Sequence, residues 1–472
     1  MASSDLIAIL PLILLAATPV TVMAAIAIRR HHGASALLAA AGMASSLLAL
    51  PAAAAEAPRR VGALIAVDGL ALYFTALVVA GALVVLALAH GYFRARPGQH
   101  EELYILLPLA TLGAAVLATG VHFVSLFLGL EILSISLYAL IAYPRRAYEV
   151  EAGIKYLILA AASSAFLLFG MALLYARHRT MELRELGAVL AADQPIAIVG
   201  LGMVLVGVGF KLALVPFHAW APDVYAGAPA PIAAFVSSVS KAGVFAMALR
   251  LVIEAGPLRE LLFLALALVA IASMLVGNLL ALLQRDVKRL LAYSSIAHLG
   301  YALVALLASG EVAIEAGAYY LGAYVVTILA AFGVVTVLSE DDRDAQDLDL
   351  YRGLFWRRPW LAALFTASLF SLAGIPLTPG FLGKFYLLLA GAESELWAPV
   401  FTLVAGSVIG LFYYLRVVFT MFAAAPAEAV TRATAPGWAA TASLAALVVP
   451  LLVLGVFPQP VVEWIRLWVA GA

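Results

Sequence analysis

The sequence contains no cysteine in its 472 residues. The chain therefore forms no disulfide, attaches no haem through thioethers and ligates no iron–sulfur cluster through cysteine. Charge is also scarce, because only 11% of the residues are Asp, Glu, Lys or Arg, against about 25% in a typical soluble domain. The positive and negative charges cancel, so the composition indicates neither nucleic acid nor an acidic substrate as a partner.

Apolar residues are what the chain has in excess. They make up 65% of the sequence, compared with about 45–50% in soluble domains. They recur as continuous runs of about 20 residues, each long enough to cross the membrane as a helix. Continuous runs favour helices over the alternating strands of a barrel. We predict an all-α polytopic membrane protein with about fourteen spans: residues 5–28, 34–55, 64–90, 103–120, 122–142, 153–175, 196–220, 229–252, 258–283, 288–308, 312–338, 359–388, 397–422 and 438–466.

Basic residues in the loops orient these spans. The loops that follow odd-numbered spans hold 14 of them, from Arg29 to Arg432, whereas the loops that follow even-numbered spans hold 6. Lysine and arginine are enriched on the cytoplasmic side of membrane proteins. We therefore expect the odd loops to face the cytoplasm and both termini to lie on the opposite, periplasmic side.

Lysine and arginine are distributed differently. The chain has 22 arginines, nearly all in loops or near helix ends, and only five lysines. Lys211, Lys241 and Lys384 lie well inside apolar runs, Lys155 lies nearer a helix end, and Lys288 lies at a boundary. A charge at the bilayer centre costs about 2.5–3.5 kcal/mol or more, so such residues are usually functional. A buried lysine can lose its proton near neutral pH, whereas arginine stays charged.

The alternative for each lysine is a structural ion pair or snorkelling to the interface. It applies to Lys155, because Glu151 lies one turn earlier, and to Lys288, which neighbours Asp286. Lys211, Lys241 and Lys384 have no carboxylate within a turn. They therefore need partners from other helices or must be neutral part of the time.

Glu131 is the acid that matches these lysines. It lies in the middle of the fifth span. Pairing with Lys211 would stabilise both charges, and breaking the pair would let the lysine release its proton. Such a switch needs no cofactor.

Two spans carry helix-breaking sequences beside a lysine. Pro216 follows Lys211 by five residues, and Lys384 follows Pro379 by five. Proline lacks an amide donor and interrupts a helix, which frees carbonyl groups. Broken helices that carry a charge in corresponding places of two halves point to a transporter built from repeats.

Two histidines are further candidates. His218 follows Lys211 by seven residues and would share its face on an unbroken helix, and His298 follows Ser294 and Ser295 in the tenth span. Both fit a proton relay, because histidine titrates near neutral pH, and both fit a satisfied structural histidine equally well. The other histidines are scattered, apart from His31 and His32. We expect the acidic loop 340–344 to be solvated.

Together these motifs resemble the antiporter-like subunits of respiratory complex I. The resemblance covers roughly residues 100–420 and is carried by residues 210–211, 216–225, 227–229, 240–241, 288–298, 374–376 and 380–385. Three classes of such subunits exist, called L, M and N. The M class has a glutamate where this chain has Lys384, and the L class has a long C-terminal extension with a lateral helix, whereas this chain stops after span fourteen. The chain is therefore most similar to the N class.

The resemblance implies an internal organisation and roles for single residues. Two inverted five-helix repeats, each with a broken helix, are expected at 103–252 and 253–422, between N-terminal helices 1–102 and a C-terminal helix 423–472. Glu131 and Lys211 would form the input pair, Lys241 the central carrier and Lys384 the link to the exit side. The positions that tune the path are matched by His218 and Lys155.

The resemblance also implies proton translocation coupled to quinone reduction, in a translocase of the bacterial inner membrane. This chain would hold no cofactor, and FMN, iron–sulfur clusters and quinone would belong to partner subunits. Its neighbours would be the M-type antiporter-like subunit, the K-type and nearby small subunits, and the lateral helix of the L-type subunit. The rival interpretations are a subunit of a multi-subunit sodium–proton antiporter, a membrane hydrogenase, and a scaffold that translocates nothing.

Overall fold

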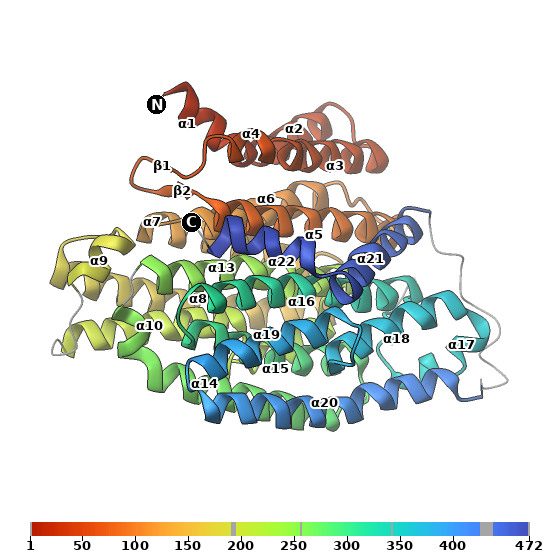
Figure 1. The fold of residues 1–472 in the computed structure, drawn as a ribbon. Helices are drawn as coiled ribbons and strands as arrows, with labels where there is room; N and C mark the ends of the chain where they lie inside the picture. Colours follow the sequence, from red (N-terminus) through yellow and green to blue (C-terminus); the bar gives the residue numbers. More distant parts are fainter. Residues whose placement is uncertain (1, 190–194, 255–256, 341–342, 425–437, 471–472) are drawn as a thin grey trace.

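Long helices packed side by side make up almost the whole molecule (Figure 1). The computed structural model describes residues 2–189, 195–254, 257–340, 343–424 and 438–470, so Arg432 lies outside the described residues. Within them, 12 helices are long and apolar enough to cross a membrane. Two shorter apolar helices, Leu103–Thr119 and Pro359–Ala373, match the other two of the fourteen expected spans. The prediction of an all-α membrane protein is confirmed, with one small hairpin added.

The N-terminal part contains this hairpin. The antiparallel strands Arg59–Val61 (β1) and Ile65–Val67 (β2) form it, so the expected span at 64–90 was wrong at its start. The helix begins instead at Gly69, because the Asp68 side chain caps it by accepting a hydrogen bond from the Ala71 amide. The helices of this part are α1 (Ser3–Ala8), α2 (Leu10–Ile28), α3 (His32–Leu48), α4 (Leu50–Ala54) and α5 (Gly69–Arg94).

Eight helices follow before residue 255. They are α6 (Leu103–Thr119), α7 (Phe123–Ile141), α8 (Ala147–His178), α9 (Leu183–Val189), α10 (Pro195–Leu212), α11 (Trp220–Gly227), α12 (Ala230–Ser237) and α13 (Val239–Glu254). The expected span at 229–252 is present as Ala230–Glu254, but it is interrupted at Ser238, between α12 and α13. This interruption lies three residues before Lys241.

The C-terminal half starts at α14. Its elements are α14 (Pro257–Leu282), α15 (Val287–Leu307), α16 (Glu311–Leu338), the 3₁₀ turn η1 (Leu348–Tyr351), α17 (Leu354–Arg357), α18 (Pro359–Ala373), α19 (Pro379–Glu393), α20 (Trp397–Phe422), α21 (Trp438–Val456), α22 (Gln459–Ile465) and the final turn η3 (Arg466–Ala470). The expected span at 438–466 ends early, at Val456. Pro458 and Pro460 follow, and neither has the amide hydrogen needed to continue α21.

The most buried helices lie at the centre of the bundle. In the segment Ala230–Glu254 the whole apolar window is buried inside the protein, and the share is 94% in α15 and 83% in α16. It is only 33% in α14 and α21, whose other faces are left to lipid or neighbours. The central helices carry Lys241, His298 and several tyrosines, so the polar groups are concentrated where no lipid reaches.

The ends of the bundle follow the expected alternation of loops. Figure 1 shows both termini, the β1–β2 hairpin and α9 at one end, and α17 at the other. The termini therefore lie on the same side, as an even number of spans requires. The two inverted repeats and their boundaries stay a prediction.

Candidate functional site

The first broken helix lies between α10 and α11. α10 ends at Leu212, and Ala213 adopts a left-handed conformation with a φ of 58°. The carbonyls released by the break find new donors: Phe210 O accepts from Trp220 Nε1 at 2.9 Å, and Lys211 O accepts from Lys241 Nζ at 2.6 Å. The break predicted from Pro216 is therefore present, and one freed carbonyl joins two of the lysines.

Lys211 is held from the side by α7 and α8. Its side chain is 3% exposed, and Nζ donates to Ser134 Oγ at 2.6 Å. Glu131, one turn before Ser134, accepts instead from Ser164 Oγ at 2.6 Å. Among the described residues no carboxylate forms a direct ion pair with Lys211. Lys211 and Glu131 thus bond to different serines, Ser134 and Ser164, and the expected direct Glu131–Lys211 ion pair is not found among the described residues.

Lys241 follows the interruption between α12 and α13. Its side chain is fully buried, and Nζ lies 4.8 Å from the centre of the Trp220 ring. Within the described residues, its hydrogen bond is the one to the backbone carbonyl Lys211 O. A cation over an aromatic face is favourable, but it does not neutralise the charge as a carboxylate would. Lys241 is therefore surrounded by neutral partners within the described part of the chain.

The second broken helix separates α18 from α19. α18 ends at Ala373, where Gly374 is left-handed with a φ of 85°, and α19 starts at Pro379 under a cap from Thr378. Lys384 Nζ donates to two carbonyls that the break releases, Leu372 O at 2.9 Å and Ala373 O at 3.0 Å. The Lys384 side chain is 5% exposed. Both breaks thus supply carbonyl oxygens to a buried lysine, and we call Lys211, Lys241 and Lys384 the lysine row.

His298 lies in α15 among tyrosines. Its Nδ1 is hydrogen-bonded to Tyr320 OH at 2.7 Å and its Nε2 to Tyr414 OH at 3.2 Å. Ser295, one turn earlier, accepts from Tyr324 OH at 2.7 Å and lies 3.5 Å from Tyr225 OH. Both ring nitrogens of His298 are satisfied, so the relay and structural interpretations both remain compatible with its position.

These hydroxyl groups fill the space between Lys241 and Lys384. Trp220, against which Lys241 packs, is 6.3 Å from Tyr225, centre to centre. At the other end Lys384 Nζ lies 5.1 Å from the centre of the Tyr301 ring, which packs on His298 at 5.4 Å. The sequence interpretation named His298 but missed these tyrosines. Their only signal was a phenol inside an apolar run, which is also common in ordinary cores.

His218 and Lys155 lie differently from the lysine row. His218 belongs to the irregular segment between α10 and α11 and is half-buried, so the helical face it was expected to share with Lys211 does not exist. Lys155 is 46% exposed and forms ion pairs with Glu151 at 2.8 Å and Asp223 at 3.2 Å. These contacts support the alternative that Lys155 forms a structural ion pair.

Asp223 joins two basic residues at this end. Arg289 Nη1 donates to Asp223 Oδ1 at 2.8 Å, while Lys155 holds the other oxygen. Burial raises the pKa of Asp223, but the hydrogen bonds from Arg289 and Lys155 outweigh it and hold this pKa below the ordinary value. Asp223 therefore remains ionised and ties α8 to α11 and α15.

Lys288 is a buried lysine of another kind. It is fully buried, and its Nζ donates to Asp344 Oδ2 at 2.7 Å and to the carbonyls of Ala226 and Ala228. Asp344 Oδ1 accepts from Tyr92 OH at 2.8 Å. The expectation that the loop 340–344 is solvated was wrong for Asp344, whose side chain is only 6% exposed. Sequence alone did not distinguish Asp344 from the other acids of the loop, of which Asp341 and Asp342 lie outside the described residues.

Two further ion pairs lie at the end that holds the termini. Arg250 of α13 is 2% exposed and pairs with Asp68, the cap of α5. Glu315 of α16 pairs with Arg466 of η3 through two hydrogen bonds, of 2.9 and 3.1 Å. The sequence interpretation singled out neither pair, because the partners are 182 and 151 residues apart.

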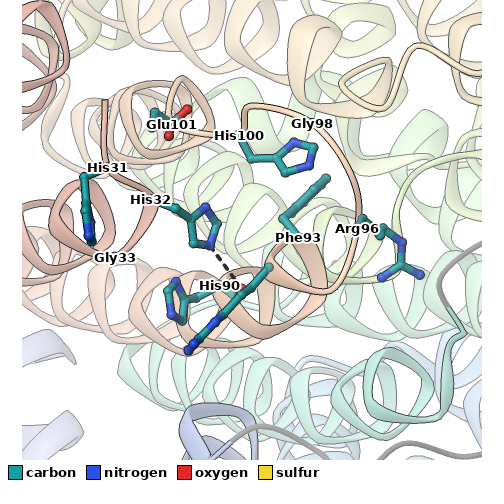
Figure 2. A pocket seen from close by; sticks show the side chains of 10 residues that line it. His31, His32, Gly33, His90, Phe93, Arg96, Gly98, His100 and Glu101 are labelled. Carbon is teal, nitrogen blue, oxygen red and sulfur yellow. Dashed lines mark hydrogen bonds between the residues drawn. The ribbon is translucent and has the colours of Figure 1, made fainter. Parts of the chain in front are cut away.

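A histidine pocket of about 380 Å³ lies apart from the lysine row, on the N-terminal helices. Figure 2 shows the rings of His31, His32, His90 and His100 around it, with Arg96 turned away. The expectation of scattered histidines was wrong for His90 and His100, which the fold brings to the His31–His32 pair. Within the described residues no group of three or more His, Asp or Glu side chains has the geometry to hold a metal ion.

Comparison with known proteins gives consistent results. Residues 121–410 match the family described as NADH:quinone oxidoreductase/Mrp antiporter, TM. The chain is 50% identical to NADH-quinone oxidoreductase subunit N of Ectopseudomonas mendocina, over 98% of this chain and 96% of that protein.

Solved structures also resemble the chain. A chain of respiratory complex I from Thermus thermophilus, solved with bound aureothin, is 34% identical, with a TM-score of 0.83 over 96% of this chain and 98% of that one. A chain of the Mrp complex from Dietzia shares the fold, with a TM-score of 0.86 over 99% and 97% of the two chains, but only 20% of the sequence.

Proposed function

The chain belongs to the NADH-quinone oxidoreductase subunit N family, and on this basis we propose that it translocates protons as an antiporter-like membrane subunit of NADH:quinone oxidoreductase. The identity of 50% to a subunit N protein, against 20% to a chain of the Mrp complex, favours this over the sodium–proton antiporter alternative. FMN, iron–sulfur clusters and quinone would then reside in partner subunits. This chain's part of the work is to move protons.

The lysine row is the observation that carries the proposal. Lys211, Lys241 and Lys384 are buried, and their polar contacts are with serine or carbonyl oxygens rather than carboxylates. An ammonium without a counter-charge is unfavourable in a region that water does not reach, so the neutral amine is an accessible alternative. Groups that can exist with and without a proton, placed in sequence across a bundle, are the elements of a proton path.

Proton movement along the row would start at Glu131. In our proposal, quinone chemistry in other subunits changes the charge near Glu131, which alters how strongly this acid holds the proton on Lys211. Lys241 follows Lys211 in this path, because its Nζ bonds to the backbone carbonyl of Lys211 and so lies beside that residue. From Lys241 the proton would pass the hydroxyls of Tyr225, Ser295 and Tyr324 toward His298 and Lys384.

The surroundings of the chain follow from the same family membership. We propose the bacterial inner membrane as its location, with both termini on the periplasmic side, as the arginine-rich odd loops favour. The partners would be the M-type antiporter-like subunit, the K-type and neighbouring small subunits, and the lateral helix of the L-type subunit. Lys155 and His218, near the odd-loop end of this path, would adjust proton entry rather than carry it.

Lys211→Met tests the proposal. The assembled complex carrying this substitution is reconstituted in liposomes, and protons pumped per NADH oxidised are measured. We expect assembly to persist, since methionine fills similar space, and coupled pumping to be largely lost. A normal ratio of protons to electrons would contradict the proposal.

Lys155→Met is the matched control. It removes the same charge by the same substitution, but from a side chain that is 46% exposed and already paired. We expect a much smaller loss of pumping than in Lys211→Met, because Lys155 would adjust proton entry but would not carry the proton. Equal losses in both variants would mean that removing any lysine disturbs the subunit, and the role of burial would be refuted.

A further inference from the structure

Glu315 and Arg466 form an ion pair at the end of the bundle toward which the lysine row leads. Arg466 Nε and Nη2 donate to the two oxygens of Glu315 at 2.9 and 3.1 Å. The exposures of the two partners differ widely, since the Glu315 side chain is 9% exposed and that of Arg466 is 62% exposed. The acid thus faces the protein interior, while its arginine faces the surrounding medium.

Tyrosines connect Glu315 to the surroundings of Lys384. Tyr319 lies one helical turn after Glu315 on α16, and Tyr320 is hydrogen-bonded to His298 Nδ1 at 2.7 Å. Tyr386, two residues after Lys384 on α19, packs on Tyr319 with ring centres 5.1 Å apart. α19 approaches α16 closely here, because a Cβ on Gly383 would lie 3.0 Å from the Tyr320 ring. A run of phenols therefore spans the distance between Lys384 and the acid.

We propose that Glu315 receives protons from the Lys384 end of the row and releases them to the medium, and that Arg466 closes this exit. The inference rests on the proposed function and on the orientation given there. A carboxyl group suits the last step, since it can hold a proton and pass it to water.

Arg466 is suited to close the exit at Glu315. Its guanidinium is always charged and occupies both carboxylate oxygens, so it competes with any proton that reaches Glu315. An arriving proton neutralises the carboxylate and releases the guanidinium, which is already largely exposed and needs little further solvation. After the proton leaves, the charged carboxylate draws Arg466 back, which opposes return of protons from the medium.

Docking of the C-terminal segment does not by itself account for the pair. Tyr319 OH donates to Leu454 O, and Tyr73 packs on Trp464 with ring centres 5.7 Å apart, so α21 and α22 have contacts of their own. Apolar contacts would hold the segment without desolvating a carboxylate, which is costly even when it is paired. The buried acid therefore calls for a role beyond attachment.

The test uses the complete complex in liposomes, with Glu315→Gln, Arg466→Gln and Lys384→Met in parallel. Two quantities are measured: protons pumped per NADH, and the rate at which the pH gradient decays once NADH is exhausted. We expect Glu315→Gln to lose as much pumping as Lys384→Met. We expect Arg466→Gln to make the gradient decay several-fold faster, because the exit no longer closes.

Arg60→Gln is the matched control for Arg466→Gln. Arg60 forms an ion pair with Glu254 at 2.8 Å at the same end of the bundle but away from the phenols, so its loss should leave the decay rate unchanged. Normal pumping by Glu315→Gln beside an impaired Lys384→Met would overturn this inference alone. Normal pumping by Lys384→Met would overturn the proposed function. Equal loss of assembly in Glu315→Gln and Arg466→Gln, with no faster decay, would show that the pair is only a clamp.

Discussion

Four of the five lysines are buried, and their partners divide them into two kinds. Lys288 forms an ion pair with Asp344, whereas the hydrogen bonds of Lys211, Lys241 and Lys384 go only to hydroxyl or carbonyl oxygens among the described residues. The buried Arg250 resembles Lys288 in this respect, because it too pairs with a carboxylate, that of Asp68. A carboxylate fixes the charge of its partner, while neutral oxygens leave the lysine free to change protonation. This difference in partners separates structural cations from candidate carriers.

Lys241→Leu distinguishes a carrier from a scaffold. Leucine preserves an apolar core, so a subunit that merely holds its neighbours together should tolerate it. We expect NADH-driven pumping to fall to a small fraction of the unmodified level while the complex assembles, because the central carrier is gone. Unchanged pumping would support the scaffold alternative.

Asp344→Asn tests whether the Lys288–Asp344 ion pair has only a structural role. Removing one partner of a buried ion pair costs about 3–5 kcal/mol, since the other charge stays buried. We expect the variant to unfold at lower temperature and to assemble less well, with normal pumping per NADH in whatever complex forms. A loss of pumping without loss of stability would place Asp344 on the path instead.

The difference in stability between wild type and Asp344→Asn should depend on pH in a definite direction. Burial raises the pKa of Asp344, but attraction by Lys288 outweighs it, so the pKa is below the ordinary 3.8. A lowered pKa stabilises the folded state above 3.8, and this stabilisation is lost as the pH falls through the folded value. The gap in unfolding temperature between wild type and Asp344→Asn should therefore be constant from pH 8 to pH 5 and shrink only at more acidic pH.

At the scale of helices, the breaks place the polar groups. Carbonyl groups inside a continuous helix are already bonded, so they cannot hold a lysine. The ends of α10 and α18 release such carbonyls inside the membrane region, where each is taken by a lysine. The positions of these breaks thus set where a proton carrier can be held.

Gly374→Ala tests this coupling of backbone and carrier. Its left-handed conformation costs an alanine about 1–2 kcal/mol, and a Cβ would lie 3.1 Å from Lys384 Cδ and 3.3 Å from Nζ. We expect Lys384 to be displaced and pumping to fall. Gly62→Ala is the control: its φ of 61° imposes comparable strain, but nothing lies within 4 Å of a Cβ there. If both variants pump equally, Lys384 does not depend on the end of α18.

At the scale of the molecule, the arrangement separates two ends with different polar groups. Lys155, Asp223 and Arg289 gather near the arginine-rich odd loops, while Asp68, Arg250 and Glu315 lie near the termini. The lysine row crosses the interior between them. The absence of cysteine makes the orientation of these ends easy to test.

Single cysteines introduced at Ala55 and Ala95 report the two sides. Both alanines are exposed at helix ends, one after an even-numbered span and one after an odd-numbered span. We expect a membrane-impermeant maleimide to label Ala55→Cys from the periplasmic side of intact spheroplasts, and Ala95→Cys only in inverted vesicles. The reverse pattern would invert the orientation and the direction assigned to the row.

The sequence by itself determined the fold class, the spans and the two prolyl breaks, because hydropathy and the missing amide of proline act locally. It also isolated the three lysines of the row, since their burial follows from the runs that contain them. It did not predict the interruption at Ser238, which no proline marks.

Only the tertiary structure decided the partners. Lys211 meets Ser134, 77 residues away, rather than Glu131; Lys288 meets Asp344; and Glu315 meets Arg466, 151 residues away. Such contacts depend on which faces of distant helices pack together, and a linear pattern of apolar residues leaves that rotation open. The sequence therefore predicts which charged residues are buried. The packing of the bundle decides which partners they meet, and so whether they can gain or lose a proton.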